Sequence, residues 1–136
     1  MKKLVISLAA LLLLVNFTYA NAGITGNIKK NAIASLVTGI RSDNMGLKRN
    51  CIYFAGKYKI AETTEVLIEE LSNTENAKLK VLISLSLFLI GDEKGMDAVY
   101  ELANKDNDKY VKRMAKAIVN EYNDSKGNNY FFTVSK

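Results

Sequence analysis

The segment LKVLISLSLFLIG, residues 79–91, decides the fold of this 136-residue chain. Between Val81 and Ile90 its only polar residues are Ser84 and Ser86, although charged residues stand close on both sides. Such a segment can be a membrane span, a buried β-strand or a helix that is covered by neighbours. A span needs roughly 20 apolar residues, and this segment is about ten residues too short.

The helical interpretation fits the segment better than the strand. On a helix, the side chains of Leu79, Ile83 and Leu87 share one face with Ser86 and Ile90. The apolar residues Val81, Leu85, Phe88 and Leu89 occupy much of the opposite face. We therefore expect a helix that is covered on both sides, and we expect Leu85→Asp to unfold the protein. The leucine alternation from Leu85 to Leu89 is also typical of a strand, which stays open as the alternative.

A repeat of about 32 residues organises the rest of the chain. An offset of 32 aligns Leu47, Leu79 and Val111, and the lysines Lys48, Lys80 and Lys112 follow them. Asn44, Asn76 and Asp108 precede the aligned segments, and each can cap a helix N-terminus. Shorter amphipathic segments lie between the long ones. The pattern predicts three antiparallel pairs of one short and one long helix, and the segment 79–91 belongs to the middle pair.

The segment LKVLISLSLFLIGDEKGMDAVYEL, residues 79–102, resembles a repeat of the HEAT type, as found in phycobilin-lyase-like HEAT families. The resemblance includes a Gly-Asp turn at Gly91 and Asp92 and an Ala-Val pair at Ala98 and Val99. It extends over residues 27–124. It implies an all-α fold, a short right-handed α-solenoid of about three HEAT-like helix pairs. Repeat proteins of this type usually bind other proteins.

The N-terminal residues have the pattern of a secretory signal peptide. Lys2 and Lys3 precede an apolar core from Leu4 to Val15, and an Ala-x-Ala pattern follows. We expect cleavage after Ala22 or after Ala20. The domains are then a signal peptide at 1–22, a HEAT-like helical repeat domain at 23–126 and an apolar C-terminal tail at 127–136. The expected location is outside the cytoplasm, in the periplasm or the extracellular space.

Composition restricts the chemistry of the chain. Removing two of the 19 basic residues with the signal peptide leaves 17 against 14 acidic residues, which does not indicate a nucleic-acid partner. The absence of histidine excludes Ser-His and Cys-His nucleophile pairs and histidine-bound metals. Cys51 is the only cysteine, and we expect a buried thiol or, alternatively, an intermolecular disulfide. We expect no catalytic, cofactor or metal site.

Three groups of residues are candidates for binding a partner. They are the acidic row Glu62, Glu65 and Glu69, the basic row Lys112, Arg113 and Lys116, and the tail residues Tyr130, Phe131 and Phe132. Each has a plainer alternative, a solvated surface for the charged rows and a strap over the last helix for the tail. The tyrosines Tyr53, Tyr58, Tyr100, Tyr110 and Tyr122 are expected in packing, and any that stay exposed are candidate contact anchors.

These features favour a non-catalytic protein–protein interaction module or adaptor in the bacterial cell envelope. Its contacts are expected on one face of the short helices, with the tail as a further contact. The alternative is an accessory or regulatory subunit of an envelope enzyme complex. Another protein is the expected partner, a membrane surface is a weaker option, and a homo-oligomer is a further one.

Overall fold

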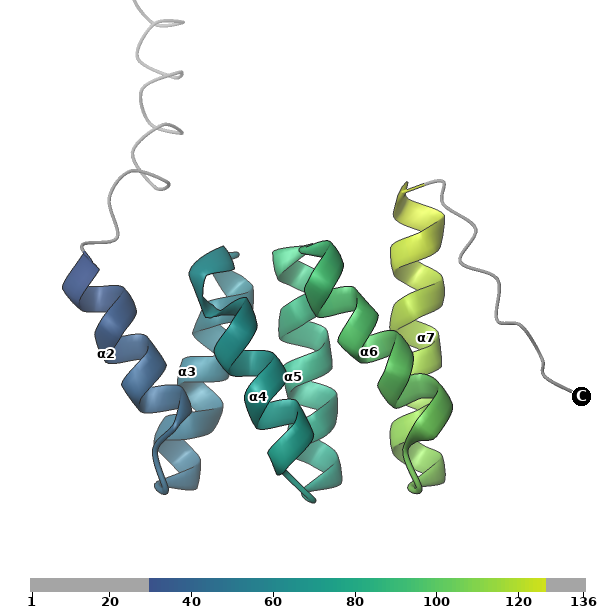
Figure 1. Ribbon diagram of the computed structural model, residues 1–136, viewed down its shortest axis with the longest axis horizontal. Coiled ribbons are helices and arrows are strands. Elements are labelled where there is room, and N and C mark those ends of the chain that lie inside the picture. Colours follow the sequence, from purple (N-terminus) through teal and green to yellow (C-terminus); the bar gives the residue numbers. More distant parts are fainter. Residues whose placement is uncertain (1–29, 127–136) are drawn as a thin grey trace, which may run out of the picture. The chain divides into compact units, whose positions relative to one another are not determined.

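The computed structural model of the chain describes residues 30–126 (Figure 1). The expected signal peptide at 1–22 and the tail residues Tyr130, Phe131 and Phe132 lie outside this range. The chain divides into two units at Ala32, and the helices that pack together belong to the second unit, from Ile33 onward.

Six α-helices and one short 3₁₀ helix make up the regular structure between residues 30 and 126, which contains no strand. They are α2 (Lys30–Ile40), α3 (Met45–Lys57), η1 (Ala61–Thr63), α4 (Thr64–Asn73), α5 (Ala77–Ile90), α6 (Glu93–Lys105) and α7 (Lys109–Lys126). The all-α prediction is confirmed. The strand alternative for residues 79–91 is wrong, because that segment forms α5.

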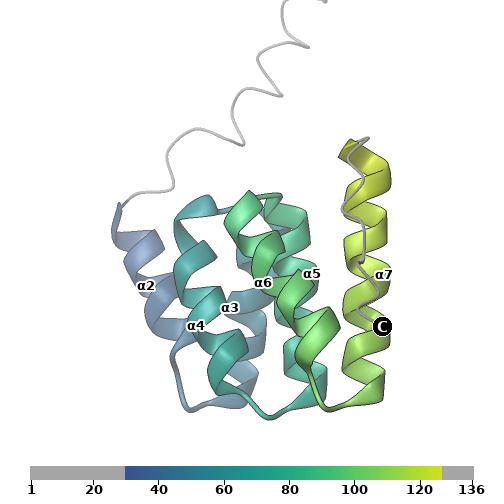
Figure 2. The ribbon, with the colours of Figure 1, turned by 45° about the vertical axis from the view of Figure 1, so that its right-hand side comes forward.

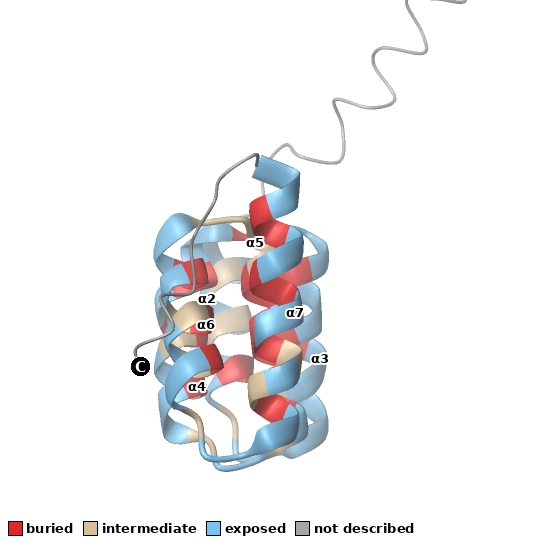
Figure 3. Ribbon diagram, turned by 90° about the vertical axis from the view of Figure 1, so that its right-hand side faces the viewer, coloured by how far each residue is buried: buried red, intermediate tan, exposed pale blue. Residues whose placement is uncertain are grey.

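The helices form two layers. Figure 3 shows α2, α4 and α6 on one side and α3, α5 and α7 on the other. Short loops reverse the chain after each helix, so that one helix of each layer follows one of the other (Figures 1 and 2). The expected alternation of short and long helices is weaker than predicted, since α6 and α3 both have 13 residues.

Helix α5 lies at the centre of the second unit. It packs between α3 and α7 within its own layer and against α4 and α6 of the other layer. Leu79, Ile83 and Leu87 are buried there, whereas Leu85 and Leu89 remain 40% and 43% exposed. The prediction that neighbours cover α5 on both sides is therefore confirmed for α3 and α7 within its layer. It is wrong for the outer face of α5, the side that carries Leu85 and Leu89. A two-layer stack has no third layer to cover that face.

The predicted helix starts are confirmed. The side chains of Asn44 and Asn76 accept hydrogen bonds from the N–H groups of Leu47 and Leu79, at 3.1 and 3.0 Å. The Asp108 carboxylate accepts from the N–H groups of Tyr110 and Val111, at 2.7 and 3.2 Å. These bonds satisfy N–H groups that have no partner within the helix.

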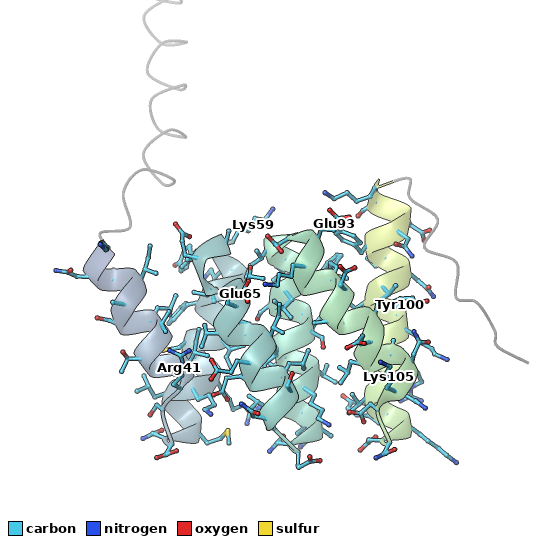
Figure 4. All side chains as sticks on the ribbon, viewed as in Figure 1. Arg41, Lys59, Glu65, Glu93, Tyr100 and Lys105 are labelled. Carbon is cyan, nitrogen blue, oxygen red and sulfur yellow. The ribbon has the colours of Figure 1, made fainter. Side chains whose placement is uncertain are left out.

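The turns between the pairs use left-handed backbone conformations. The Gly-Asp turn has Gly91 at a φ of 75°, and Asp92 then caps α6 through the N–H of Gly95. At the matching turn after α3, Lys59 takes a φ of 52° without being glycine (Figure 4). The repeat therefore keeps the turn even where the Gly-Asp sequence is missing, at a strain of about 1 kcal/mol.

Two glycines allow helices or turns to approach closely. A Cβ added to Gly56 would lie 2.6 Å from the Cα of Ser86, so α3 and α5 are in backbone contact here. The Ser86 hydroxyl donates a hydrogen bond to the carbonyl of Ile52 at 2.9 Å across the same contact. Gly39 lies similarly against Cys51, whose thiol is buried, and this burial raises its pKa.

Helix α7 is buried on one side and exposed on the other. Its buried residues are Val111, Ala115, Ile118, Val119, Tyr122 and Asn123. Arg113, Lys116 and Asn120 are exposed on the helix, and buried and exposed positions follow one another along it in Figure 3. The last described helix thus presents polar residues on its uncovered side.

Candidate functional site

The predicted acidic row lies on the layer of α2, α4 and α6. Glu69 accepts a hydrogen bond from Arg41 at 2.6 Å, and Glu65 forms an ion pair with Lys94. Arg41 and Glu65 are labelled in Figure 4. These pairs join α4 to its two neighbours in the layer, and because all four side chains are exposed each contributes at most about 1 kcal/mol. Glu62 is exposed in η1. Two of the three candidate residues therefore already have partners within the chain.

The predicted basic row of α7 does not form one uniform patch. Lys112 is half-buried and its charge acts on Asp106. The Arg113 guanidinium lies over the Tyr110 ring, 5.8 Å from its centroid. Lys116 is exposed. Binding of a partner by these residues stays a prediction.

A groove of about 520 Å³ lies between α4 and α6, next to the loops that precede α5 and α7. Ile68, Leu71 and Leu102 contribute apolar walls. Its charged residues include two ion pairs, Lys80 with Asp106 at 2.6 Å and Lys105 with Glu101 at 2.7 Å. The two pairs neutralise each other, and the remaining charged lining residues, Glu75 and Asp108, leave the groove with a surplus of negative charge.

The repeated lysines have a structural role. Lys48 donates to Glu70 and Lys80 donates to Asp106, each at 2.6 Å, and both pairs are largely buried. Burial opposes ionisation of Asp106, but the hydrogen bond from Lys80, the N–H of Asp108 and the charges of Lys80 and Lys112 together lower the pKa of this carboxyl. The ionised form of Asp106 is therefore favoured by the folded state.

We expect Asp106→Asn to reduce stability near pH 7 by about 1–3 kcal/mol, because it removes a charge-assisted hydrogen bond from a mostly buried position. The folded-state pKa of Asp106 lies below its unfolded value, so its contribution is present above the unfolded pKa and is lost as the pH falls through the folded one. Urea denaturation from pH 7 to about pH 3 should show wild type and variant converging on acidification.

Glu101→Gln is the matched control, because Glu101 also pairs with a lysine but lies in water. It should change the pH dependence much less than Asp106→Asn. A gap between wild type and Asp106→Asn that stays constant over the whole pH range would contradict the assignment.

The exposed apolar surface lies on the other layer. Every large apolar side chain that is exposed between residues 30 and 126 belongs to α3, α5, α7 or the residue that directly follows α3. These side chains are Met45, Leu47, Tyr53, Phe54, Tyr58, Leu85, Leu89 and Tyr110. The expectation of contacts on the short helices therefore does not match where the apolar surface lies.

Three residues of this surface form a cluster around one lysine. The ring centroids of Tyr53 and Phe54 are 5.7 Å apart, and those of Phe54 and Tyr58 are 6.0 Å apart. The Lys57 ammonium lies 5.7 Å from the Tyr53 centroid and 5.5 Å from the Tyr58 centroid. Each of these cation–π contacts is worth about 0.5–1 kcal/mol at an exposed site. The cluster is preformed, with aromatic surface and positive charge in one place.

The expectation that the tyrosines pack inside the fold is wrong for Tyr53, Tyr58 and Tyr110, which are exposed. Because these three tyrosines are exposed, they are the candidate contact anchors that the sequence analysis expected among any exposed tyrosines. The available signal was the 32-residue alignment itself, because within residues 30–126 no long helix precedes α3 to cover the positions that later copies bury.

No helix in the described range has both the length and the apolar character to cross a membrane. Residues 30–126 also contain no group of three or more acidic, cysteine or histidine side chains that could hold a metal ion. No family model, curated protein or solved structure was found to match the chain.

Proposed function

We propose that the chain is a non-catalytic protein-binding module, an exported bacterial adaptor built as a short α-solenoid of HEAT-like helix pairs. The observation that carries the proposal is the apolar surface of α3, α5 and α7, which gathers all the large exposed apolar side chains of residues 30–126. Surfaces of this kind are costly in water and are typical of interaction sites. The tyrosines add the residue type that is enriched among binding anchors.

Further features support binding over catalysis. The sequence has no histidine, and its single cysteine is buried. In the α4–α6 groove the buried ion pair Lys80–Asp106 ties α5 to the residue that ends α6, which is a structural role. The basic residues and apolar core at the N-terminus support export.

Site-specific photo-crosslinking in the producing cells tests the proposal. A photoreactive residue at Leu85 or at Phe54 should give a discrete adduct with one identified protein, because both positions lie on the apolar surface. The same residue at Asp97, an exposed polar position on α6, is the control and should give none. Equal labelling from all three positions, or no adduct from either apolar position, would overturn the proposal.

The identity of the adduct separates the two functions expected from the sequence. An accessory subunit requires that the crosslinked protein is an enzyme whose turnover changes when this chain is removed. An adaptor requires a crosslinked protein that binds further components through the complex.

A further inference from the structure

Helix α3 exposes the positions that its later copies bury. Leu47 is 49% exposed, whereas the equivalent Leu79 and Val111 are 2% and 0% exposed. Tyr58 is 53% exposed and its equivalent Tyr122 only 6%. Phe54 is 43% exposed, while Ser86 and Ile118 at the same repeat position are buried. We call the surface formed by Leu47, Phe54, Lys57 and Tyr58 the open α3 face.

The repeat indicates what shape fits the open α3 face. Ser86 of α5 packs against α3, and α5 packs in turn against α7. At the Ser86 position, which corresponds to Phe54, the neighbour is α3, a helix that lies alongside α5 in the same layer (Figure 1). An occupant that satisfies the open α3 face in the same manner is therefore a helix with an apolar stripe.

The charge around the open α3 face indicates the chemistry of that helix. From Met45 to Ile60 the sequence has four basic residues, Lys48, Arg49, Lys57 and Lys59, and no acidic one. Lys48 is neutralised by Glu70. Arg49, Lys57 and Lys59 form no ion pair with any residue from 30 to 126. A helix with acidic residues beside its apolar stripe would supply the missing partners.

We propose that the open α3 face binds an amphipathic helix of another protein, with acidic residues flanking the apolar stripe. This rests on the proposed function and adds the surface and the partner's chemistry. The partner's apolar stripe covers Leu47, Phe54 and Tyr58, and its carboxylates pair with Lys57 and Lys59. Tyr and Phe supply large contact area, and the cations supply the preference for acidic partners.

Other occupants fit the charge less well. A second copy that packed face to face would bring two sets of Lys57 and Lys59 together, and like charges oppose such contacts. The chain's own residues 1–29 and 127–136 contain lysines and no acidic residue. Neither end of the chain therefore supplies carboxylates to the open α3 face.

Two labelled helical peptides of roughly five turns test the proposal. They share one apolar stripe and differ only in carrying glutamate or lysine beside it. Fluorescence anisotropy with the full-length protein should give at least about tenfold tighter binding of the glutamate peptide. Lys57→Glu should weaken binding of the glutamate peptide and strengthen binding of the lysine peptide. Loss of folding cannot produce this reversal.

Phe54→Asp and Leu89→Asp form a matched pair, because both side chains are 43% exposed and only Phe54 lies on the open α3 face. Phe54→Asp should lower the affinity for the glutamate peptide about tenfold or more, and Leu89→Asp should change that affinity less than about twofold. Circular dichroism of both variants checks that the helices are retained.

Four results would overturn the proposal. They are equal affinity for the two peptides, no effect of Phe54→Asp, a dimer in sedimentation that Phe54→Asp dissociates, and Phe54-dependent binding to phosphatidylglycerol vesicles without peptide preference. The third assigns the face to a second copy and the fourth to a lipid surface. If a photoreactive residue at Leu85 still captures one identified protein while that at Phe54 does not, the proposed function stands and only this inference fails.

Discussion

Replacing Gly56 by alanine is expected to lower the free energy of unfolding by about 1–3 kcal/mol, which is the usual range for overpacking a close contact. The added methyl group would lie 2.6 Å from the Cα and 2.8 Å from the Cβ of Ser86, and backbone cannot move aside as a flexible side chain can. The helices α3 and α5 would have to separate. That shift would also strain the hydrogen bond from Ser86 to the carbonyl of Ile52. Urea denaturation followed by circular dichroism measures the loss.

Gly46→Ala is the control, because Gly46 lies on the same helix and is exposed. The only atom near its added Cβ is the Asn44 side-chain oxygen at 3.3 Å. Alanine is the better helix former by about 1 kcal/mol, so this variant should be neutral or slightly more stable than wild type. Equal effects of the two substitutions would show that helix propensity, and not the contact with Ser86, governs Gly56.

Local signals in the sequence predicted much of the fold. Asn44, Asn76 and Asp108 cap helices as expected, since capping depends only on residues within one turn. The three residues were recognisable by type and by their offset of 32 alone. The apolar character of α5 correctly placed it between neighbours in its own layer.

The exposure of single apolar side chains could not be predicted in the same way. The helical pattern of α5 shows that Leu85 and Ile83 point in different directions, but it does not show that only one of the two faces meets another layer. Similarly, Leu47 and Leu79 have the same sequence position in the repeat. Their exposure differs because α5 has an earlier neighbour in its layer and α3 has none within residues 30–126.

The ion pairs could not be predicted from the sequence for a different reason. Lys80 and Asp106 are 26 positions apart, and Arg41 and Glu69 are 28 positions apart. Whether such residues meet depends on the angle between helices and on loop length, which periodicity does not define. Sequence reasoning therefore identified Glu65 and Glu69 as one row but could not show that each already has a basic partner.

The second large effect is expected from Ile83→Ala, which should reduce the free energy of unfolding by about 2–5 kcal/mol. Ile83 is fully buried on the face of α5 that meets the core, where it belongs to one cluster with Leu67, Leu87 and Val99. Removing its branched side chain leaves a cavity that the surrounding helices cannot fill without moving. Thermal and urea melts should both show the loss, and the helical signal of any folded fraction should stay unchanged.

Leu85→Ala is the matched control from the same helix, two positions away, and should cost only about 1 kcal/mol because 40% of Leu85 is already exposed. For the same reason Leu85→Asp should keep a cooperative melt, which reverses the expectation drawn from the sequence: the aspartate can stay hydrated on the outer face. If both Leu85 variants destabilised the chain as much as Ile83→Ala, that face of α5 would have to be covered in solution. A stable neighbour would then lie on the surface where we propose that partners bind.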